Sequence, residues 1–121
     1  MVPCYSVLQN NVHKDIAMKI IQLFLTCPNQ AEAHGIATLL LEKRLVACVK
    51  MMPITAQFLW QGVIESSNEI LMIMESEDSK FDAIEQEVRN VHSYETFVLT
   101  ATQVVKASSG VAKWIQESIQ L

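Results

Sequence analysis

The chain is poor in the residue patterns on which several classes of enzyme depend. It has only three glycines in 121 residues, too few for a loop that cradles phosphate groups. Neither a GxGxxG nor a P-loop pattern is present, and the nucleophile elbow and the HExxH motif are missing too. An enzyme is therefore poorly supported, and we expect a protein that is not one.

Cysteine is scarce as well, and its spacing argues against a disulfide framework. The three cysteines, Cys4, Cys27 and Cys48, are an odd number and form no CxxC pair. We therefore expect a reduced, cytoplasmic protein. A nucleophilic pair of Cys27 or Cys48 with His92 is conceivable in three dimensions, but no local signature supports it.

Positive charge and long apolar runs are also lacking. The net charge of -4 and the lack of a basic face argue against nucleic acid and against an anionic membrane surface as partners. The longest apolar segments, residues 20–27 and 70–74, have the length of strands and fall well short of a membrane span. Residues 1–17 lack the charged start and apolar core of a secretory signal, and we expect a flexible extension over 1–18.

What is present is a core-forming composition, because 50% of the residues are apolar and 18% are charged. One domain over 19–121 is expected. Helical spacing of apolar residues predicts helices that begin at Asn29, Ser79 and Ser109, and Asn29 with Glu32 resembles a capping box. The predicted strands cover residues 19–27, 45–52, 54–64, 69–76 and 97–105.

Two chain breakers and one polar segment decide the topology of the middle of the chain. Pro53 marks a break or bend, Gly62 suggests a bulge or a close backbone approach, and residues 65–68 are predicted as a turn. If the strands on either side of Pro53 form one bent hairpin arm, the order is β-α-β-β-α-β. This order predicts an α+β, ferredoxin-like fold, in which an antiparallel sheet carries two helices on one face, with an extra C-terminal helix. The strands are apolar on both faces, so we expect the uncovered face to be buried in an oligomer.

Four segments lie in the order and spacing of a known family. They are TCP (26–28), EKRLVACVK (42–50), LWQGVIESSNEI (59–70) and HSYET (92–96). Together they cover nearly the whole domain, and they resemble the divalent-cation tolerance (CutA) proteins. The resemblance implies a ferredoxin-like subunit, related in architecture to the trimeric PII signalling proteins. It also implies a tight homotrimer in which long hairpins pair strands between subunits.

Several positions depart from the family's usual pattern. The prolines on both sides of the tyrosine motif are Ser93 and Phe97 here, and the glutamate after the second proline is Val98. The usual lysine at the end of the fourth strand is Glu75, and the usual tyrosine before the C-terminal tryptophan is Val111. A function that needs that lysine or that tyrosine is therefore in question for this chain.

His92, in the HSYET segment, is the leading candidate for a metal ligand, because neutral imidazole is the commonest metal ligand in proteins. Glu95 or Cys27 would be a second donor, and Cys27 would be a soft ligand suited to copper. The structural alternatives stay open. His92 could interact with a helix C-terminus and cap a carbonyl group, and Cys27 could be a small core residue.

Three further residues are candidates for the wall of the ligand site. Trp60 and Tyr94 would shape a cleft at the subunit boundary, and Glu69 could pair with a cation across the hairpin. Each has a structural alternative. Trp60 could anchor an interface, Tyr94 could place its hydroxyl at an interface rim, and Glu69 could be a solvated charge.

Two hypotheses from different functional classes follow. The first is a cytoplasmic homotrimer that binds a divalent metal such as copper, or a small anion–metal complex, in clefts between its subunits. The second is a trimeric scaffold or signalling protein that presents a surface, or residues 1–18, to an unidentified partner protein. The departures from the family's pattern favour the second hypothesis more than they would in a typical member. A small-molecule hydrolase is the weakest alternative.

Overall fold

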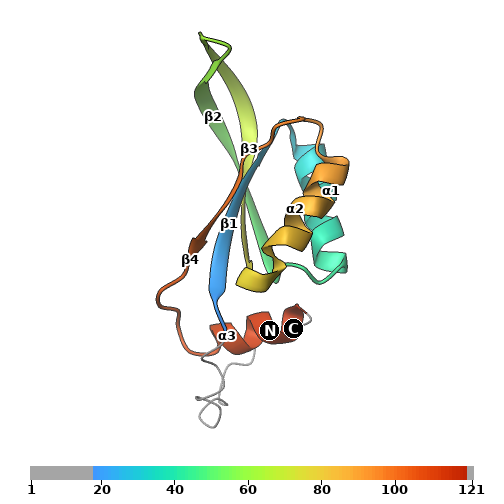
Figure 1. Cartoon of the computed structure of the whole chain (residues 1–121), viewed down its shortest axis with the longest axis vertical. Helices are drawn as coiled ribbons and strands as arrows, with labels where there is room; N and C mark the ends of the chain where they lie inside the picture. Colours follow the sequence, from blue (N-terminus) through green and yellow to red (C-terminus); the bar gives the residue numbers. More distant parts are fainter. Residues whose placement is uncertain (1–17, 120–121) are drawn as a thin grey trace.

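The computed structural model describes residues 18–119, so the extension expected over 1–18 lies, except for its last residue, outside the described residues. The described chain has an α+β fold with one antiparallel sheet of four strands (Figure 1). Its elements are β1 (Ile20–Cys27), α1 (Gln30–Glu42), β2 (Cys48–Trp60), β3 (Val63–Glu77), the 3-10 helix η3 (Asp78–Lys80), α2 (Phe81–Val91), β4 (Leu99–Gln103) and α3 (Val111–Ser118). The strand order is β2-β3-β1-β4, which makes β2 and β4 the edges. None of the described helices is long and apolar enough to cross a membrane.

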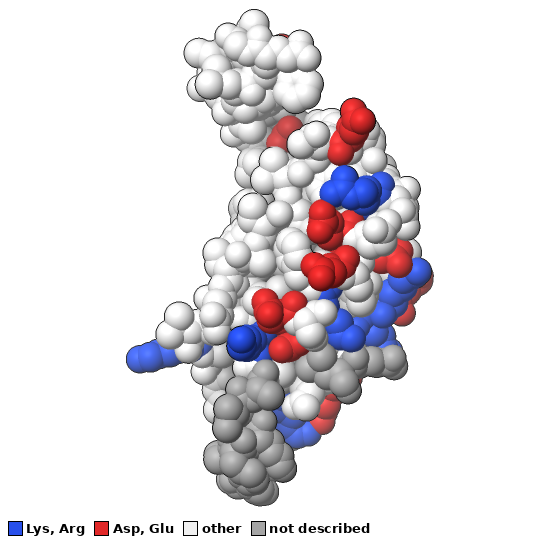
Figure 2. Space-filling view, viewed as in Figure 1, with Lys and Arg blue, Asp and Glu red and all other residues white. Residues whose placement is uncertain are grey.

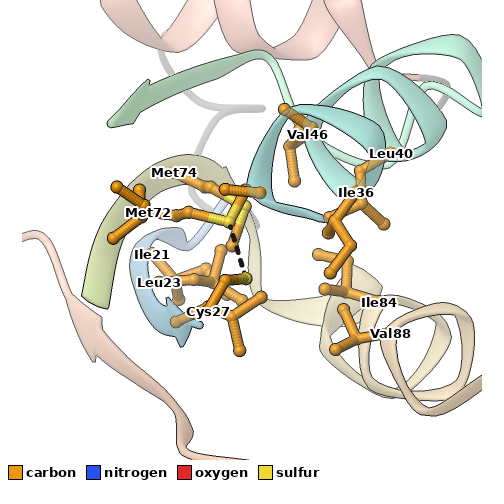
Figure 3. Close-up of a cluster of buried hydrophobic side chains, with 14 residues drawn as sticks. Ile21, Leu23, Cys27, Ile36, Leu40, Val46, Met72, Met74, Ile84 and Val88 are labelled. Carbon is orange, nitrogen blue, oxygen red and sulfur yellow. Dashed lines mark hydrogen bonds between the residues drawn. The ribbon is translucent and has the colours of Figure 1, made fainter. Parts of the chain in front are cut away.

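The core forms under one face of the sheet. Every second residue of β1 from Ile21 to Cys27 is buried, because successive side chains of a strand point to opposite faces. Both α1 and α2 lie on this face of the sheet (Figure 1). Figure 3 shows the apolar side chains that meet there, which include Leu23, Ile36, Leu40, Val46, Met72, Met74, Ile84 and Val88.

The opposite face of the sheet is left uncovered by α1 and α2. Phe24 of β1 lies opposite Ile73 of β3 in the ladder, and both are only partly buried. On the neighbouring edge strand, Met52 is 45% exposed. Within residues 18–119, the structure therefore has the apolar face that the sequence predicted, and this face is a candidate contact surface.

The strands β2 and β3 form a long arm that projects beyond the helices (Figure 1). Their pairing runs without interruption to Trp60 opposite Val63. Gln61 and Gly62 join them as a two-residue turn with φ angles of 51° and 81°. Positive φ at both central positions is what a type I′ hairpin turn requires, and glycine adopts it without strain.

This arm corrects two expectations from the sequence and confirms a third. The turn predicted at 65–68 is wrong, since these residues pair with residues 55–58 of β2. The expected bulge at the glycine is wrong as well, because the glycine is in the turn itself. The residues on either side of Pro53 form the single strand β2, which is the alternative that gave the order β-α-β-β-α-β. Pro53 lies on an edge strand, where a missing N–H donor is tolerated.

Helix α1 starts where the sequence predicts, but only one of the two hydrogen bonds of the expected capping box is present. Asn29 caps the helix, with its Oδ1 accepting the N–H of Glu32 at 2.9 Å. The Glu32 side chain does not complete a capping box. Its carboxylate accepts the N–H of Ser93, 61 residues further along the chain.

The starts of the other helices differ from the prediction. Ser79 lies inside η3, whose first turn is capped by the side chain of Glu77. The last helix follows Gly110, which has no side-chain capping bond, so Ser109 is not the cap. The strand predicted over 97–105 is shorter, because only residues 99–103 pair with β1.

Candidate metal centre

Three elements of the fold bring chemically different side chains together. Cys27 ends β1, Glu32 lies in the first turn of α1, and His92 follows the last residue of α2. One ligand atom from each residue, a sulfur, a carboxylate oxygen and a ring nitrogen, lies within 4.8 Å of the other two. The short connection through Asn29 places the first turn of α1 beside the end of β1. We call these three residues the Cys27–Glu32–His92 cluster.

His92 is held by a hydrogen bond at each ring nitrogen, and its side chain is 0% exposed. Its Nε2 lies 2.9 Å from the carbonyl oxygen of Thr26, and its Nδ1 lies 3.0 Å from the backbone nitrogen of Tyr94. A carbonyl oxygen can only accept and a backbone N–H can only donate. Nε2 therefore carries the proton, and the lone pair of Nδ1 accepts the Tyr94 N–H. One alternative from the sequence was that His92 caps a carbonyl group at a helix C-terminus. The carbonyl group that His92 caps is that of Thr26, which belongs to β1.

Glu32 reaches from α1 to the segment that follows α2. Its Oε2 accepts the backbone N–H of Ser93 at 2.9 Å and the Ser93 hydroxyl at 3.2 Å. The same oxygen lies 3.4 Å from Nδ1 of His92. Sequence reasoning assigned Glu32 to a helix cap and missed it here. A carboxylate in the first turn of a helix that begins where a strand ends is the signal that could have found it.

Cys27 is fully buried and keeps its proton. Its thiol donates to the sulfur of Met72 at 3.5 Å (Figure 3). Burial raises the pKa of the thiol to about 12, and the carboxylates of Glu32 and Glu69 contribute to the increase. An ion that binds this sulfur must therefore displace a firmly held proton.

Tyr94 and Glu69 border the cluster. The Tyr94 ring lies 5.1 Å from the His92 ring, and Phe97 stacks on His92 at 5.2 Å. Burial raises the pKa of the Tyr94 hydroxyl, as do the charges of Glu69 and Glu32 and a hydrogen bond with Glu69. Glu69 also accepts the Ser67 hydroxyl at 3.0 Å. Its cross-strand neighbour on the hairpin is an isoleucine and not a cation.

The other two candidates from the sequence lie apart from the cluster. Glu95 is exposed and supplies no atom to the cluster. Trp60 is 54% exposed next to the hairpin turn. The hairpin tip shows almost no charged side chain in the space-filling view (Figure 2). The exposed tip is therefore separate, within one chain, from the largely buried cluster.

Three of the residues that depart from the family's usual pattern make side-chain contacts in the structure. Ser93 binds Glu32, and Phe97 stacks on His92 and carries the Arg89 guanidinium 4.9 Å above its ring. Glu75 forms an ion pair with Lys50 at 3.1 Å. The two valines differ from these residues. Val98 is 61% exposed, and Val111 is half-buried in the first turn of α3.

Known proteins resemble this chain over nearly its whole described length. The family described as CutA1 divalent ion tolerance protein matches residues 21–118. The divalent-cation tolerance protein CutA of Archaeoglobus fulgidus is 37% identical over 98 residues, which cover 81% of this chain and 96% of that protein. The human Protein CutA is 38% identical over 95 residues, or 78% of this chain. These residues cover 53% of the human protein, so the match spans about half of its length.

A solved structure agrees with the sequence comparison. The periplasmic divalent cation tolerance protein CutA from Archaeoglobus fulgidus has a TM-score of 0.82 and 36% identity, covering 84% of this chain and 99% of that one. The archaeal relative is named as a tolerance protein and not as an enzyme. The four segments of the sequence, the α+β fold and the match over residues 21–118 agree, and the chain belongs to the CutA1 divalent ion tolerance protein family.

Proposed function

We propose that this protein binds a divalent metal ion at the Cys27–Glu32–His92 cluster and acts in divalent-cation tolerance. The observation that carries the proposal is the convergence of three ligand atoms within 4.8 Å of one another. They come from parts of the chain as far apart as 65 residues (92 − 27). Membership of the CutA1 family supports the tolerance role.

The donor set fits a borderline-soft ion. A thiolate, an imidazole and one carboxylate suit zinc or copper, whereas magnesium and calcium prefer oxygen ligands alone. Oxygen and nitrogen ligands at about 2.1 Å from a tetrahedral ion lie about 3.4 Å apart. The distance between Glu32 Oε2 and His92 Nδ1 is 3.4 Å. Three protein ligands would leave one position for water or for a small anion.

The remaining site residues take different places in the proposal. Tyr94 and Glu69 border the cluster and would shape the wall beside the ion. Trp60 would reach such a site only from another subunit, because it lies at the hairpin tip. Glu95, expected as a ligand from the sequence, would have to approach from solvent. We therefore assign the carboxylate ligand to Glu32.

A ferredoxin-like, PII-like homotrimer is the assembly that we propose. The strand order β2-β3-β1-β4 and the helices on one face support the ferredoxin-like arrangement. The open apolar sheet face and the hairpin tip support association, since Leu59 is 73% and Ile64 71% exposed. Light scattering at micromolar concentration tests this proposal, and a monomer would contradict it.

A cytoplasmic location is also part of the proposal. Cys27 and Cys48 are free thiols in the structure, which supports a reduced compartment. The Archaeoglobus relative is described as periplasmic, so location needs its own test. Cell fractionation with the full chain would locate the protein, and an extracytoplasmic pool would contradict this part of the proposal.

A trimeric scaffold that binds a partner protein is the second candidate. It is favoured by the hydrogen bonds that already satisfy Glu32 and His92, because these residues then have a structural role without any ion. The exposed apolar hairpin tip is the surface that such a partner would contact.

Metal analysis separates the two candidates. Purified full-length protein is dialysed against a mixture of copper, zinc, nickel and manganese ions, and the bound metal per chain is counted. We expect one equivalent in the wild type and in the control Glu95→Gln, and a loss of that equivalent in His92→Ala and Glu32→Gln. No bound metal in any of the four proteins would exclude metal binding and favour the scaffold.

A further inference from the structure

The cluster cannot take up an ion through His92 in its observed conformation. A neutral imidazole has one in-plane lone pair, and at His92 that lone pair accepts the N–H of Tyr94 at 3.0 Å. The other ring nitrogen carries its proton toward the Thr26 carbonyl at 2.9 Å. An ion that coordinates Nδ1 must therefore displace the Tyr94 N–H.

One carboxylate oxygen of Glu32 is blocked in a similar way by Ser93, the residue before Tyr94. Its Oε2, the oxygen 3.4 Å from His92 Nδ1, accepts both the N–H and the hydroxyl of Ser93. Two donors use both lone pairs of that oxygen. The N–H groups of two consecutive residues, Ser93 and Tyr94, thus occupy the two ligand atoms that face each other across the cluster.

Ser93 and Tyr94 belong to a segment that lies outside the helices and the sheet. Residues 92–98 connect α2 to β4 and belong to neither element. Residues 93–96 are exposed and take no part in the pairing of the sheet. Their movement would break the three hydrogen bonds to the cluster and the contacts of Tyr94 with His92 and Glu69, but no pairing of the sheet.

We propose that the Ser93–Tyr94 backbone is a gate that competes with the ion, so that metal binding at the cluster and release of this turn are one event. This inference rests on the proposed function and specifies how that site is regulated. Ser93 then sets the affinity for the ion without being a ligand. Its N–H and hydroxyl hold Glu32 Oε2, and an ion that binds this oxygen must exchange these bonds for its own.

Substitution of Ser93 tests the competition, because proline removes both donors and alanine removes only the hydroxyl. The residue before position 93 suits a proline, since His92 has φ -74° and ψ 138°, the extended region preferred before proline. Zinc binding to metal-free full-length protein is measured by calorimetry. We expect Ser93→Pro to tighten binding about tenfold, as expected for one competing charge-assisted hydrogen bond. Ser93→Ala should tighten it less, and the exposed hairpin control Ser66→Ala should not change it.

Amide hydrogen exchange of the wild type gives a readout that does not depend on the variants folding. We expect the amides of Ser93 and Tyr94 to exchange faster in the zinc-saturated protein than in the metal-free protein. Unchanged exchange at saturating zinc, or weaker zinc binding by Ser93→Pro, would overturn the gate and leave the metal site standing. Weaker binding would mean that Ser93 orients Glu32 for the ion. No zinc binding to any variant would overturn the metal site and the gate with it.

Discussion

Glu77 is a buried carboxylate that joins the start of β1 to the start of η3, and its replacement should destabilise the protein measurably. It is 7% exposed. Its oxygens accept the N–H of Lys19 at 3.2 Å, the N–H of Ser79 at 2.9 Å and the Ser79 hydroxyl. Each bond to a charged acceptor contributes about 1.5–3 kcal/mol. In Glu77→Gln an NH₂ group faces one of these donors. We expect the free energy of unfolding to fall by about 2–3 kcal/mol.

The pKa of Glu77 gives this prediction a pH signature. Burial alone would raise the pKa, but the hydrogen bonds from Ser79 and Lys19 and the charge of Lys80 outweigh burial and hold it below 4.5. A lowered folded-state pKa means that the stabilisation is complete above the unfolded-state pKa. It is then lost as the pH falls through the folded-state pKa. The difference between wild type and Glu77→Gln should therefore be full at neutral pH and shrink below pH 4.5.

Urea unfolding at neutral and acidic pH measures both effects. The protein concentration must stay fixed, because self-association would couple stability to concentration. Glu42→Gln is the control, since this exposed carboxylate ends α1 and its replacement should change stability by less than about 0.5 kcal/mol. A loss of less than about 0.5 kcal/mol in Glu77→Gln, or a loss that grows in acid, would refute the reasoning.

Three further changes test the core, the turn and the hairpin tip. Leu23→Ala removes a fully buried side chain and should cost about 3 kcal/mol in urea unfolding, and a cost below about 1 kcal/mol would contradict the assigned core. Gln61→Gly relieves a positive φ of 51° and should raise the melting temperature, with a gain of about 0.5 kcal/mol. A lower melting temperature would argue against this turn. Trp60→Asp places a charge on the apolar tip and should shift sedimentation toward smaller species, whereas unchanged association would exclude the tip from the interface.

The position of the hairpin turn could not be predicted from the hydrophobic pattern of the sequence. The order of the strands and helices could be predicted because core strands alternate and core helices have an apolar face. Residues 65–68 are polar because this part of the arm extends beyond the helices. Within this part, Asn68 accepts a hydrogen bond from Thr55 across the ladder at 3.4 Å. An exposed strand made of polar residues has the composition of a turn, so the sequence pattern cannot tell the two apart. The observed turn consists of Gln61, in a strained conformation, and Gly62.

The cluster was predictable only in part, for a different reason. Cys27 and His92 stand out by their chemistry, and the structure brings them together. Glu32 could not be chosen over Glu95, because the choice depends on a contact between residues 61 positions apart. Proximity along the chain favoured Glu95, while the packing of α1 against α2 selected Glu32. The fold therefore decides the carboxylate, although the sequence points to the imidazole and the thiol.

The hydrogen bonds of the cluster also determine what kind of metal site it can be. No buried side-chain nitrogen or oxygen within residues 18–119 lacks a partner, so Glu32 and His92 are satisfied without an ion. A structural zinc site behaves differently, since its ligands have no other role and the fold depends on the metal. An ion that bound here, as we propose, would gain only the difference between its own bonds and the bonds that it replaces, and it would also have to displace the Cys27 proton. Such a site would bind its ion weakly and reversibly, and not as a permanent part of the fold.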